Sequence, residues 1–432
     1  MTDRQAGATG DSRLRRDLGL GDAVVVGLGA MLGAGVFAAL APAAGAAGAA
    51  LPAALVLAAA VAYCNATSSA QLAAAYPESG GTYVYGRKRL GPFWGFLAGW
   101  AFVVGKVASC AAMALTFGAY AAPGAARPLA IGAVVALTAV NYRGVRKTAR
   151  LTRVIVALVL LALTIVVAAA LTGGTAATDN LVPRNGIDGR GVLQAAGLLF
   201  FAFAGYARIA TLGEEVRDPQ RTIPRAIPIA LGITLLVYAL VAVAALLAVG
   251  SARLAATDAP LAVALTGGRW AALAPVVRAG ATVACLGVLL SLLVGVSRTL
   301  FAMAAHGDAF RRLAAVHPRF AVPHRAEVVV AACVVAVVAV ADVRGSIGFS
   351  SFAVLTYYAI ANAAAWTQPT QQRRWPRTLQ VAGLVGCALL AANLPTASVL
   401  GGLAVLAVGG LWWAGRARVT RNRAARADGP PT

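Results

Sequence analysis

Long apolar runs follow one another along almost the whole chain, and they limit what it can fold into. A helix needs about 20 predominantly apolar residues to cross the hydrocarbon core of a bilayer, with a range of about 17 to 25. Runs of this length or longer occupy residues 20–44, 48–72, 92–121, 126–142, 152–172, 192–213, 226–250, 273–304, 325–341, 347–366, 378–394 and 397–415. Only 12% of the residues are charged, whereas soluble domains carry about 25%. The pattern predicts an all-α integral membrane protein with about 12 transmembrane helices.

The formal net charge of +22 comes mostly from basic residues in the short segments between these runs. A nucleic-acid binder gathers its Lys and Arg residues on one folded face, so we expect no nucleic-acid partner. The five cysteines lie within apolar runs and have no Cys-x-x-Cys spacing. This is typical of buried small side chains rather than of disulfides or metal ligands. We expect neither a metal site nor a cofactor.

The distribution of Lys and Arg predicts the orientation, because cytoplasmic loops carry an excess of both. If the N-terminus is cytoplasmic, 28 of the 37 Lys and Arg residues lie on the cytoplasmic side and 7 on the opposite side. We therefore expect a multi-pass protein of the cell membrane with both termini in the cytoplasm. The expected parts are an N-terminal tail (1–18), a ten-span core (19–366), spans 11 and 12 (367–415) and a basic tail (416–432). We expect the basic tail to be disordered and to contact anionic membrane lipid.

The first span contains the sequence GLGAMLGAGVF, with glycines at positions 27, 29, 33 and 35. A glycine inside a helix costs about 1 kcal/mol relative to alanine, so we expect this helix to unwind near its middle. Irregular backbone within a membrane persists only where it is buried in protein or lines a wet cavity. The sixth span carries Gly205 after a phenylalanine-rich stretch. Interruptions in spans 1 and 6 are typical of transporters with a five-plus-five inverted repeat and a substrate site at the repeat interface.

Four segments resemble the amino acid–polyamine–organocation (APC) superfamily. They are GLGAMLGAGVF in the first span, YPESGGTYVYGRKRLGPFWGFLAGW from the second to the third, FFAFAGYARIATLGEEVRDPQRTIPRAI in and after the sixth, and SRTLFAMAAHGDAF at the end of the eighth. They follow the family's order. The resemblance implies a LeuT-like fold of ten core helices, with unwound spans 1 and 6 and two further C-terminal helices. It also implies amino acid transport by alternating access.

The resemblance assigns the substrate α-carboxylate to backbone amides of the first span. These belong to Gly33, Ala34 and Gly35, with Met31 and Leu32 just before the break. Ala34 stands where relatives commonly have a serine, so one hydroxyl contact is missing from the expected site.

In the sixth span, the resemblance places the substrate-facing aromatic side chain at Phe201 or Phe203. The carbonyls of Ala204 and Gly205 are expected to receive the α-ammonium group. A phenylalanine wall offers packing and cation–π attraction but no hydrogen bond. Plain core packing is the alternative for either phenylalanine.

Lys106 lies midway along the third span, within FVVGKVASC. A charge inside a membrane is costly and indicates a functional site. By the resemblance, the third span lines the substrate site, and a lysine there departs from the family. Because a desolvated lysine can titrate near neutral pH, we expect Lys106 to be the proton-coupling group, or a fixed cation in place of sodium. A structural lysine, ion-paired or extended toward the membrane surface, is the alternative.

Arg208 follows the sixth-span interruption, and we expect it to pair with Glu214, Glu215 or Glu78 in an inner gate. A structural ion pair without a gating role is the alternative. Some relatives have an acidic residue near this position, and the reversed sign argues against a cationic substrate. Residues 76–92 are expected to form a short helix or a re-entrant turn, and residues 214–228, with three prolines, a charged loop.

In the eighth span, Ser291 and Ser297 are the polar residues near the place where sodium-coupled members of this fold hold an ion. Sodium needs several oxygen ligands, which two serines alone do not supply. The sequence therefore favours a proton over sodium as the coupling ion.

Together these features predict a secondary active transporter that imports amino acids by proton symport. An exchanger of an amino acid for an amine is the second interpretation, although the spans supply no interior carboxylate for a polyamine. An enzyme would need a nucleophile, an acid–base pair or metal ligands at depth, and the spans contain no histidine and no paired carboxylates. A transporter-like nutrient sensor is the third interpretation, which an additional soluble domain would favour.

Overall fold

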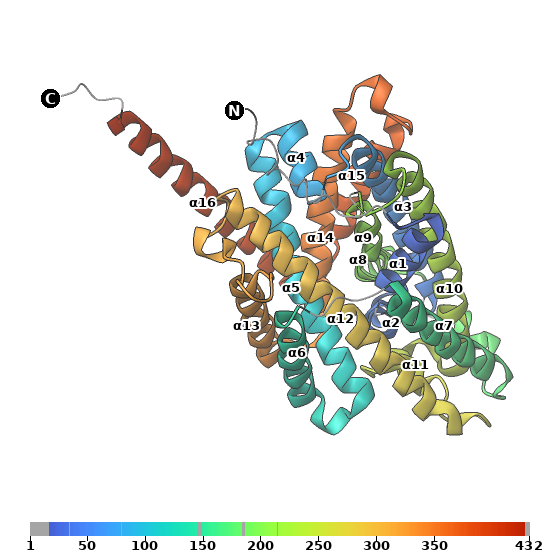
Figure 1. Cartoon of the computed structure of the whole chain (residues 1–432). Helices are drawn as coiled ribbons and strands as arrows, with labels where there is room; N and C mark the ends of the chain where they lie inside the picture. Colours follow the sequence, from blue (N-terminus) through green and yellow to red (C-terminus); the bar gives the residue numbers. More distant parts are fainter. Residues whose placement is uncertain are drawn as a thin grey trace.

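The computed structural model describes residues 17–33, 35–78, 80–144, 149–183, 186–213 and 215–427; the side chains of Ala149 and of residues after Arg416 are not described. Within these residues, every regular element is a helix, apart from one isolated β-bridge between Leu18 and Val216 (Figure 1). The helices are α1 Leu20–Leu32, α2 Gly35–Ala47, α3 Leu51–Ala75, α4 Thr82–Leu90, α5 Pro92–Ala121, α6 Ala126–Tyr142, α7 Ala149–Thr172, α8 Gly189–Phe203, α9 Ala207–Ala210, α10 Pro219–Ala255, α11 Pro260–Val263, α12 Ala274–Ala305, α13 His324–Val340, α14 Val343–Trp366, α15 Arg377–Ala392 and α16 Thr396–Ala427.

Each predicted span corresponds to one helix or to one interrupted pair of helices. The first span is α1 followed by α2, and the sixth is α8, a 3-10 turn (Ala204–Tyr206) and α9. Within the described part of the chain, nine helical stretches are long and apolar enough to cross a membrane. The helices α1 and α15 are shorter apolar segments, and α13 has 17 residues. The all-α, multi-pass membrane architecture predicted from the sequence is therefore confirmed.

Two segments differ from their predicted structure. The helix α10 begins at Pro219 rather than near residue 226, because Pro219 occupies the first helical turn, where a missing N–H costs no hydrogen bond. The helix α16 continues through Ala427, so the basic tail is helical at least to that residue, where disorder was expected. The short helix expected between spans 2 and 3 is present as α4.

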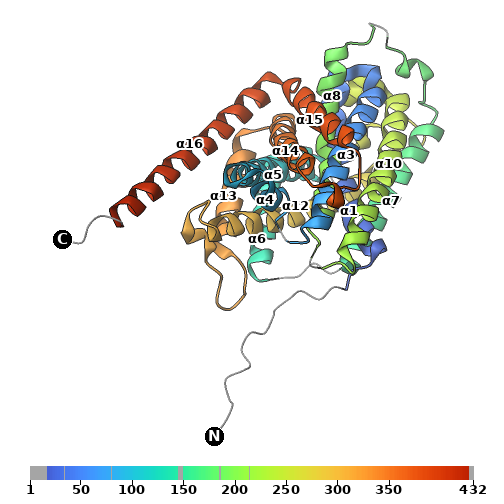
Figure 2. The ribbon, with the colours of Figure 1, turned by 90° about the horizontal axis from the view of Figure 1, so that it is seen from above.

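The packing of the helices follows the predicted repeat. Helix α2 of the first span packs against α8 of the sixth, and α3 of the second span packs against α10 of the seventh. In the same way, α5 of the third span packs against α12 of the eighth, and α6 of the fourth against α13 of the ninth. The tenth span, α14, packs against both α3 and α5, so it connects the α3–α10 pair with the α5–α12 pair. Helix α16 lies at the outside of the molecule and extends beyond the other helices (Figure 2).

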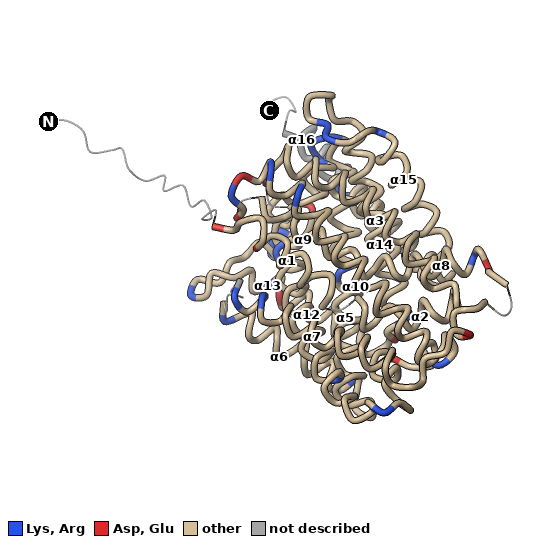
Figure 3. The backbone as a smooth tube through the Cα atoms, turned by 90° about the vertical axis from the view of Figure 1, so that its right-hand side faces the viewer, with Lys and Arg blue, Asp and Glu red and all other residues tan. Residues whose placement is uncertain are grey.

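Charged residues gather at the two ends of the helices, while the middle is almost entirely uncharged (Figure 3). One end carries α4, and the opposite end carries α11 (Figure 1). We call them the α4 end and the α11 end. The start of the described chain lies at the α4 end, where Leu18 pairs with Val216 and Asp22 forms an ion pair with Arg153.

Candidate functional site

The interruptions of the first and sixth spans lie against each other in the middle of the molecule. Helix α1 ends at Leu32, Gly33 caps it, and α2 begins at Gly35. Gly205, in the 3-10 turn of the sixth span, faces the end of α1 so closely that a Cβ atom would lie 2.5 Å from the Ala30 carbonyl oxygen. Only glycine permits this approach of two backbones. The structure therefore explains why the sixth span carries a glycine at this position.

Two buried tyrosine hydroxyls donate hydrogen bonds to backbone carbonyl oxygens at the interruptions. The Tyr238 hydroxyl of α10 lies 2.6 Å from the Met31 carbonyl oxygen and 3.2 Å from that of Ala202. The Tyr358 hydroxyl of α14 donates to the Ala204 carbonyl oxygen at 3.2 Å. A carbonyl without its helical partner is costly in a membrane, so these tyrosines stabilise the interrupted backbone.

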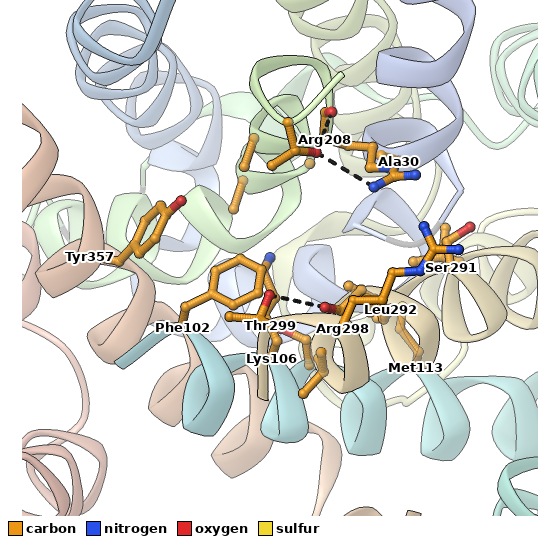
Figure 4. Close-up of a pocket in the computed structure, with 18 of the residues that line it drawn as sticks. Ala30, Phe102, Lys106, Met113, Arg208, Ser291, Leu292, Arg298, Thr299 and Tyr357 are labelled. Carbon is orange, nitrogen blue, oxygen red and sulfur yellow. Dashed lines mark hydrogen bonds between the residues drawn. The ribbon is translucent and has the colours of Figure 1, made fainter. Parts of the chain in front are cut away.

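A cavity of about 250 Å³ lies beside the two interruptions (Figure 4). It is lined from α1 and α2 by Ala30 and Gly35; from α5 by Phe102, Lys106, Ser109 and Met113; from the sixth span by Phe201, Ala202, Ala204, Gly205, Ala207 and Arg208; from α12 by Val288, Ser291, Leu292, Gly295, Val296, Arg298, Thr299 and Ala302; and elsewhere by Gly80, Tyr83, Thr211, Glu215 and Tyr357.

The cavity reaches the α4 end but not the α11 end. On α5, the lining runs from Phe102 to Met113, in the middle of the helix, but Gly80 and Tyr83, which precede α5 at the α4 end, also line the cavity. On α12, which ends at the α4 end, the lining runs from Val288 to Ala302, and residues 274–287 take no part. The cavity thus extends from the middle of the molecule toward one side.

The residues expected to bind substrate divide into two sets. Gly35, Phe201, Ala204 and Gly205 line the cavity. The others that the structure describes are buried outside its lining, namely Met31, Leu32, Gly33 and Phe203. Phe203 instead packs against Tyr238, with ring centroids 5.2 Å apart. Ala34 lies outside the described residues.

Lys106 is buried, with 8% of its surface exposed, and it lies on the cavity-facing side of α5 (Figure 4). Its cavity-lining neighbours Phe102, Ser109 and Met113 are spaced as one face of a helix requires. Among the described residues, no carboxylate lies within 4 Å of its amine. A buried cation without a carboxylate partner, in a cavity inside a membrane protein, marks a functional position.

Comparison with known proteins identifies the family. The family model described as "Amino acid permease" matches residues 18–414. A Mycobacterium tuberculosis protein whose name calls it an uncharacterized transporter is 62% identical over 423 residues, which cover 97% of this chain and 95% of that protein. The branched-chain amino acid permease of Bacillus subtilis is 27% identical over 350 residues, covering 75% of this chain and 74% of that protein. Human cationic amino acid transporter 4 is 30% identical over 346 residues, 73% of this chain and 54% of the relative.

The chain belongs to the amino acid permease family. It is therefore a membrane transporter of the APC superfamily and not an enzyme, as the sequence motifs predicted. The names of the relatives describe those proteins, and they include more than one class of amino acid.

At the α4 end of this permease, charged residues surround the mouth of the cavity. Arg208 and Arg298 are exposed, and Glu215 is partly buried. Arg208 lies 3.5 Å from the Thr211 hydroxyl, at the limit for a hydrogen bond, and Glu78 forms its ion pair with Lys88 rather than with Arg208. Glu214, the other expected partner of Arg208, lies outside the described residues.

The two serines of the eighth span differ in position. Ser291 lines the cavity and donates to the Gly287 carbonyl oxygen at 3.1 Å. Ser297 is 1% exposed, lies outside the lining and donates to the Leu293 carbonyl oxygen at 2.8 Å. Both hydroxyl hydrogens therefore have an acceptor one turn back in α12.

A buried carboxylate beside the mouth joins three helices of the permease. Asp308, which follows α12, pairs with Arg87 of α4 and, at 3.1 Å, with Arg416 of α16. The Tyr83 hydroxyl donates to the same carboxylate at 2.8 Å. Burial, together with this carboxylate, raises the pKa of Tyr83, so its hydroxyl keeps the proton that it donates. The cluster fixes α4, which supplies Tyr83 to the cavity.

Sequence reasoning missed several residues of the site. Phe102, Ser109 and Met113 could have been found, because they flank Lys106 at helical spacing on an interior span. Tyr238 and Tyr358 carry a hydroxyl within an apolar run, which is a weaker signal. Arg298 lies near the end of the predicted span 273–304, and whether it reaches the cavity depends on how α12 crosses α5.

Proposed function

We propose that this permease imports amino acids across the cell membrane by alternating access, coupled to protons. The observation that carries the proposal is the cavity itself. It is lined by residues of both helix interruptions, it contains Lys106, whose amine has no carboxylate partner among the described residues, and its lining extends toward the α4 end but not toward the α11 end. A pathway open to one side at a time is what alternating access requires.

The α-carboxylate of the substrate is proposed to bind at the start of α2. The first amides of a helix have no intrahelical acceptor, and the helix dipole favours a negative charge there. Gly35 opens α2 and lines the cavity. The α-ammonium group is proposed to contact the carbonyls of Ala204 and Gly205. The Ala204 carbonyl already accepts from Tyr358, but a carbonyl oxygen has two lone pairs and can accept a second hydrogen bond.

Lys106 is proposed as the proton-coupling group. In its charged form it carries a proton in the cavity, and a bound carboxylate would stabilise that form by its opposite charge. The other titratable or charged groups of the described lining are Tyr357 of α14, Tyr83 of α4, Arg298 of α12, Arg208 of α9 and Glu215. Proton and substrate would then enter together, because each favours the other's binding.

The α4 end is proposed to face the cytoplasm. Most of the Lys and Arg residues lie in segments on that side of the predicted topology, and such segments stay cytoplasmic during insertion. In this orientation, both termini are cytoplasmic and the present cavity is open inward.

The test is uptake by the purified protein in proteoliposomes. A panel of labelled amino acids is supplied outside, with and without an inward proton gradient. The proposal predicts accumulation that the gradient stimulates and that a proton ionophore abolishes. Uptake that requires preloading with an amine, and that ignores the gradient, would contradict symport and favour exchange. Stimulation by a sodium gradient alone would contradict the choice of the proton.

A further inference from the structure

Lys106 points to the class of substrate. We infer that this permease takes an amino acid with a second carboxylate, and that the Lys106 ammonium pairs with that side-chain carboxylate. The inference rests on the proposed function, since it concerns the same cavity, and it adds a substrate class to it.

The charges around the cavity carry the first step. The charged residues in its described lining are Lys106, Arg208, Arg298 and Glu215. Positive charge is therefore in excess. Glu215, which follows the sixth span, lies at the mouth of the cavity, as do Arg208 and Arg298. Such a field attracts anionic ligands and repels cationic ones.

The position of Lys106 carries the second step. It is buried at the centre of α5 and lines the same cavity as Gly35 and Gly205. In the described structure its amine has no carboxylate partner. When the mouth closes around a substrate, water leaves the cavity and the ammonium needs a counter-charge, because an unpaired charge in a dry site is strongly disfavoured.

A neutral amino acid supplies that counter-charge poorly. Its single carboxylate is already drawn to the start of α2, and its own ammonium group repels that of Lys106. A dicarboxylic amino acid satisfies both sites at once, with one carboxylate at α2 and the other at α5. The apolar side chains Phe102, Phe201 and Leu292 of the lining are left to pack against its methylene groups.

The pairing also joins substrate selection to proton coupling. An ammonium group that is stabilised only by a substrate carboxylate holds its proton best when the anionic substrate is bound. A proton and a monoanionic substrate would then cross the membrane with their charges cancelled.

The first experiment uses the wild-type protein in proteoliposomes with an inward proton gradient. Initial uptake rates of labelled glutamate, aspartate, leucine and lysine are measured at one concentration. We expect glutamate or aspartate to enter at least tenfold faster than leucine, and lysine not to accumulate. Leucine uptake that excess glutamate and aspartate fail to inhibit would overturn the inference and leave the proposed function standing. No accumulation of any amino acid would overturn the proposed function itself.

The second experiment uses Lys106→Met, which keeps an unbranched side chain of similar length and removes the charge. Entry is measured without a proton gradient, because this variant also lacks the proposed proton-coupling group. We expect the ratio of acidic to neutral amino acid entry to fall at least tenfold relative to the wild-type protein. Lys106→Arg, which keeps the charge, should retain most of the ratio. Arg221→Gln is the matched control, because it removes an exposed cation outside the cavity lining, and we expect its ratio to change less than threefold. An unchanged ratio in Lys106→Met would overturn the inference. If Lys106→Met does not fold, the wild-type competition experiment still decides the matter.

Discussion

The molecule is closed at the α11 end, whereas the cavity opens toward the α4 end. At the α11 end, the buried hydroxyl of Tyr120 donates to the Phe37 carbonyl oxygen at 3.3 Å and accepts from the Leu261 amide at 3.2 Å. The rings of Phe37 and Tyr120 meet edge to face, 5.8 Å apart, and Arg278 donates to the Tyr120 carbonyl oxygen at 3.1 Å. One tyrosine of α5 thus contacts α2, α11 and α12.

At the α4 end, by contrast, exposed arginines flank an open mouth, and the hydrogen bonds lie to one side of it, around Asp308. The difference indicates where the proposed alternating access would act. Under that proposal, the contacts of Tyr120 break and the residues at the mouth come together, while the two interruptions stay in contact. The predictions below test this division, from the largest expected effect to the smallest.

The close contact between the two interruptions lies between the two ends of the molecule, and both ends depend on it. Its loss should therefore have the largest effect. Gly205→Ala places a Cβ atom against the backbone of Ala30 and Met31, and one of the two interruptions must move. We expect at least a tenfold loss of uptake and a lower melting temperature, since overpacking costs about 1 to 3 kcal/mol. Gly232→Ala in α10 is the control, because its Cβ meets nothing within 4 Å. Equal uptake by the two variants would contradict the assignment.

The second largest effect should be a difference in how fast a reagent in water labels cysteines introduced near the two ends. Thr299 lines the cavity, whereas Thr116, further along α5 toward the α11 end, is fully buried. In a background without the five native cysteines, a membrane-impermeant maleimide should label Thr299→Cys at least tenfold faster than Thr116→Cys. Labelling of Thr299→Cys should occur only from the α4 side. Equal labelling rates at the two positions would contradict the claim that the α4 end is open and the α11 end is closed.

Weakening the contacts at the closed α11 end should reduce the difference in labelling between the two sides. Tyr120→Phe keeps the ring packing but removes the hydroxyl that contacts α2 and α11. A hydrogen bond contributes about 1 kcal/mol net, which corresponds to a shift of about fivefold in a conformational equilibrium. We expect labelling of a cavity cysteine from the α11 side to increase by roughly this factor. Tyr63→Phe is the control, since Tyr63 of α3 is exposed on the outer surface. An unchanged rate in Tyr120→Phe would show that the hydroxyl does not hold this end closed.

The smallest effect is expected beside the open mouth. Asp308→Asn removes the carboxylate that Arg87 and Arg416 share, but both arginines remain partly exposed and keep some hydration. We expect a loss of about 1 to 2 kcal/mol, measured as a fall of a few degrees in melting temperature. Asp218→Asn, in an exposed pair with Arg221, should change stability by less than about 0.5 kcal/mol. Equal effects would mean that the Asp308 cluster does not hold α4.

Much of the fold could be predicted because membrane spans depend on local composition. The predicted spans 92–121 and 126–142 coincide with α5 and α6, and the glycines indicated the break after Leu32. The start of α10 at Pro219 was missed because proline suits both a loop and a first helical turn.

The candidate site was harder to predict, because its geometry depends on contacts between distant segments. Sequence reasoning could not separate Phe201, which lines the cavity, from Phe203, which packs on Tyr238. It also could not find that the hydroxyl of Tyr238, which lies 207 residues from Met31, donates to the carbonyl oxygens of Met31 and Ala202 at the two interruptions. Lys106 was found because a charge inside a span stands out whatever surrounds it.

The most direct measurement is an experimental structure of the permease with the amino acid that the uptake panel identifies. We predict substrate density in the cavity between Gly35, Gly205 and Lys106, with its α-carboxylate about 3 Å from amides at the start of α2. Density at another site, with this cavity empty at saturating substrate, would contradict the claim that the two interruptions form the transport site.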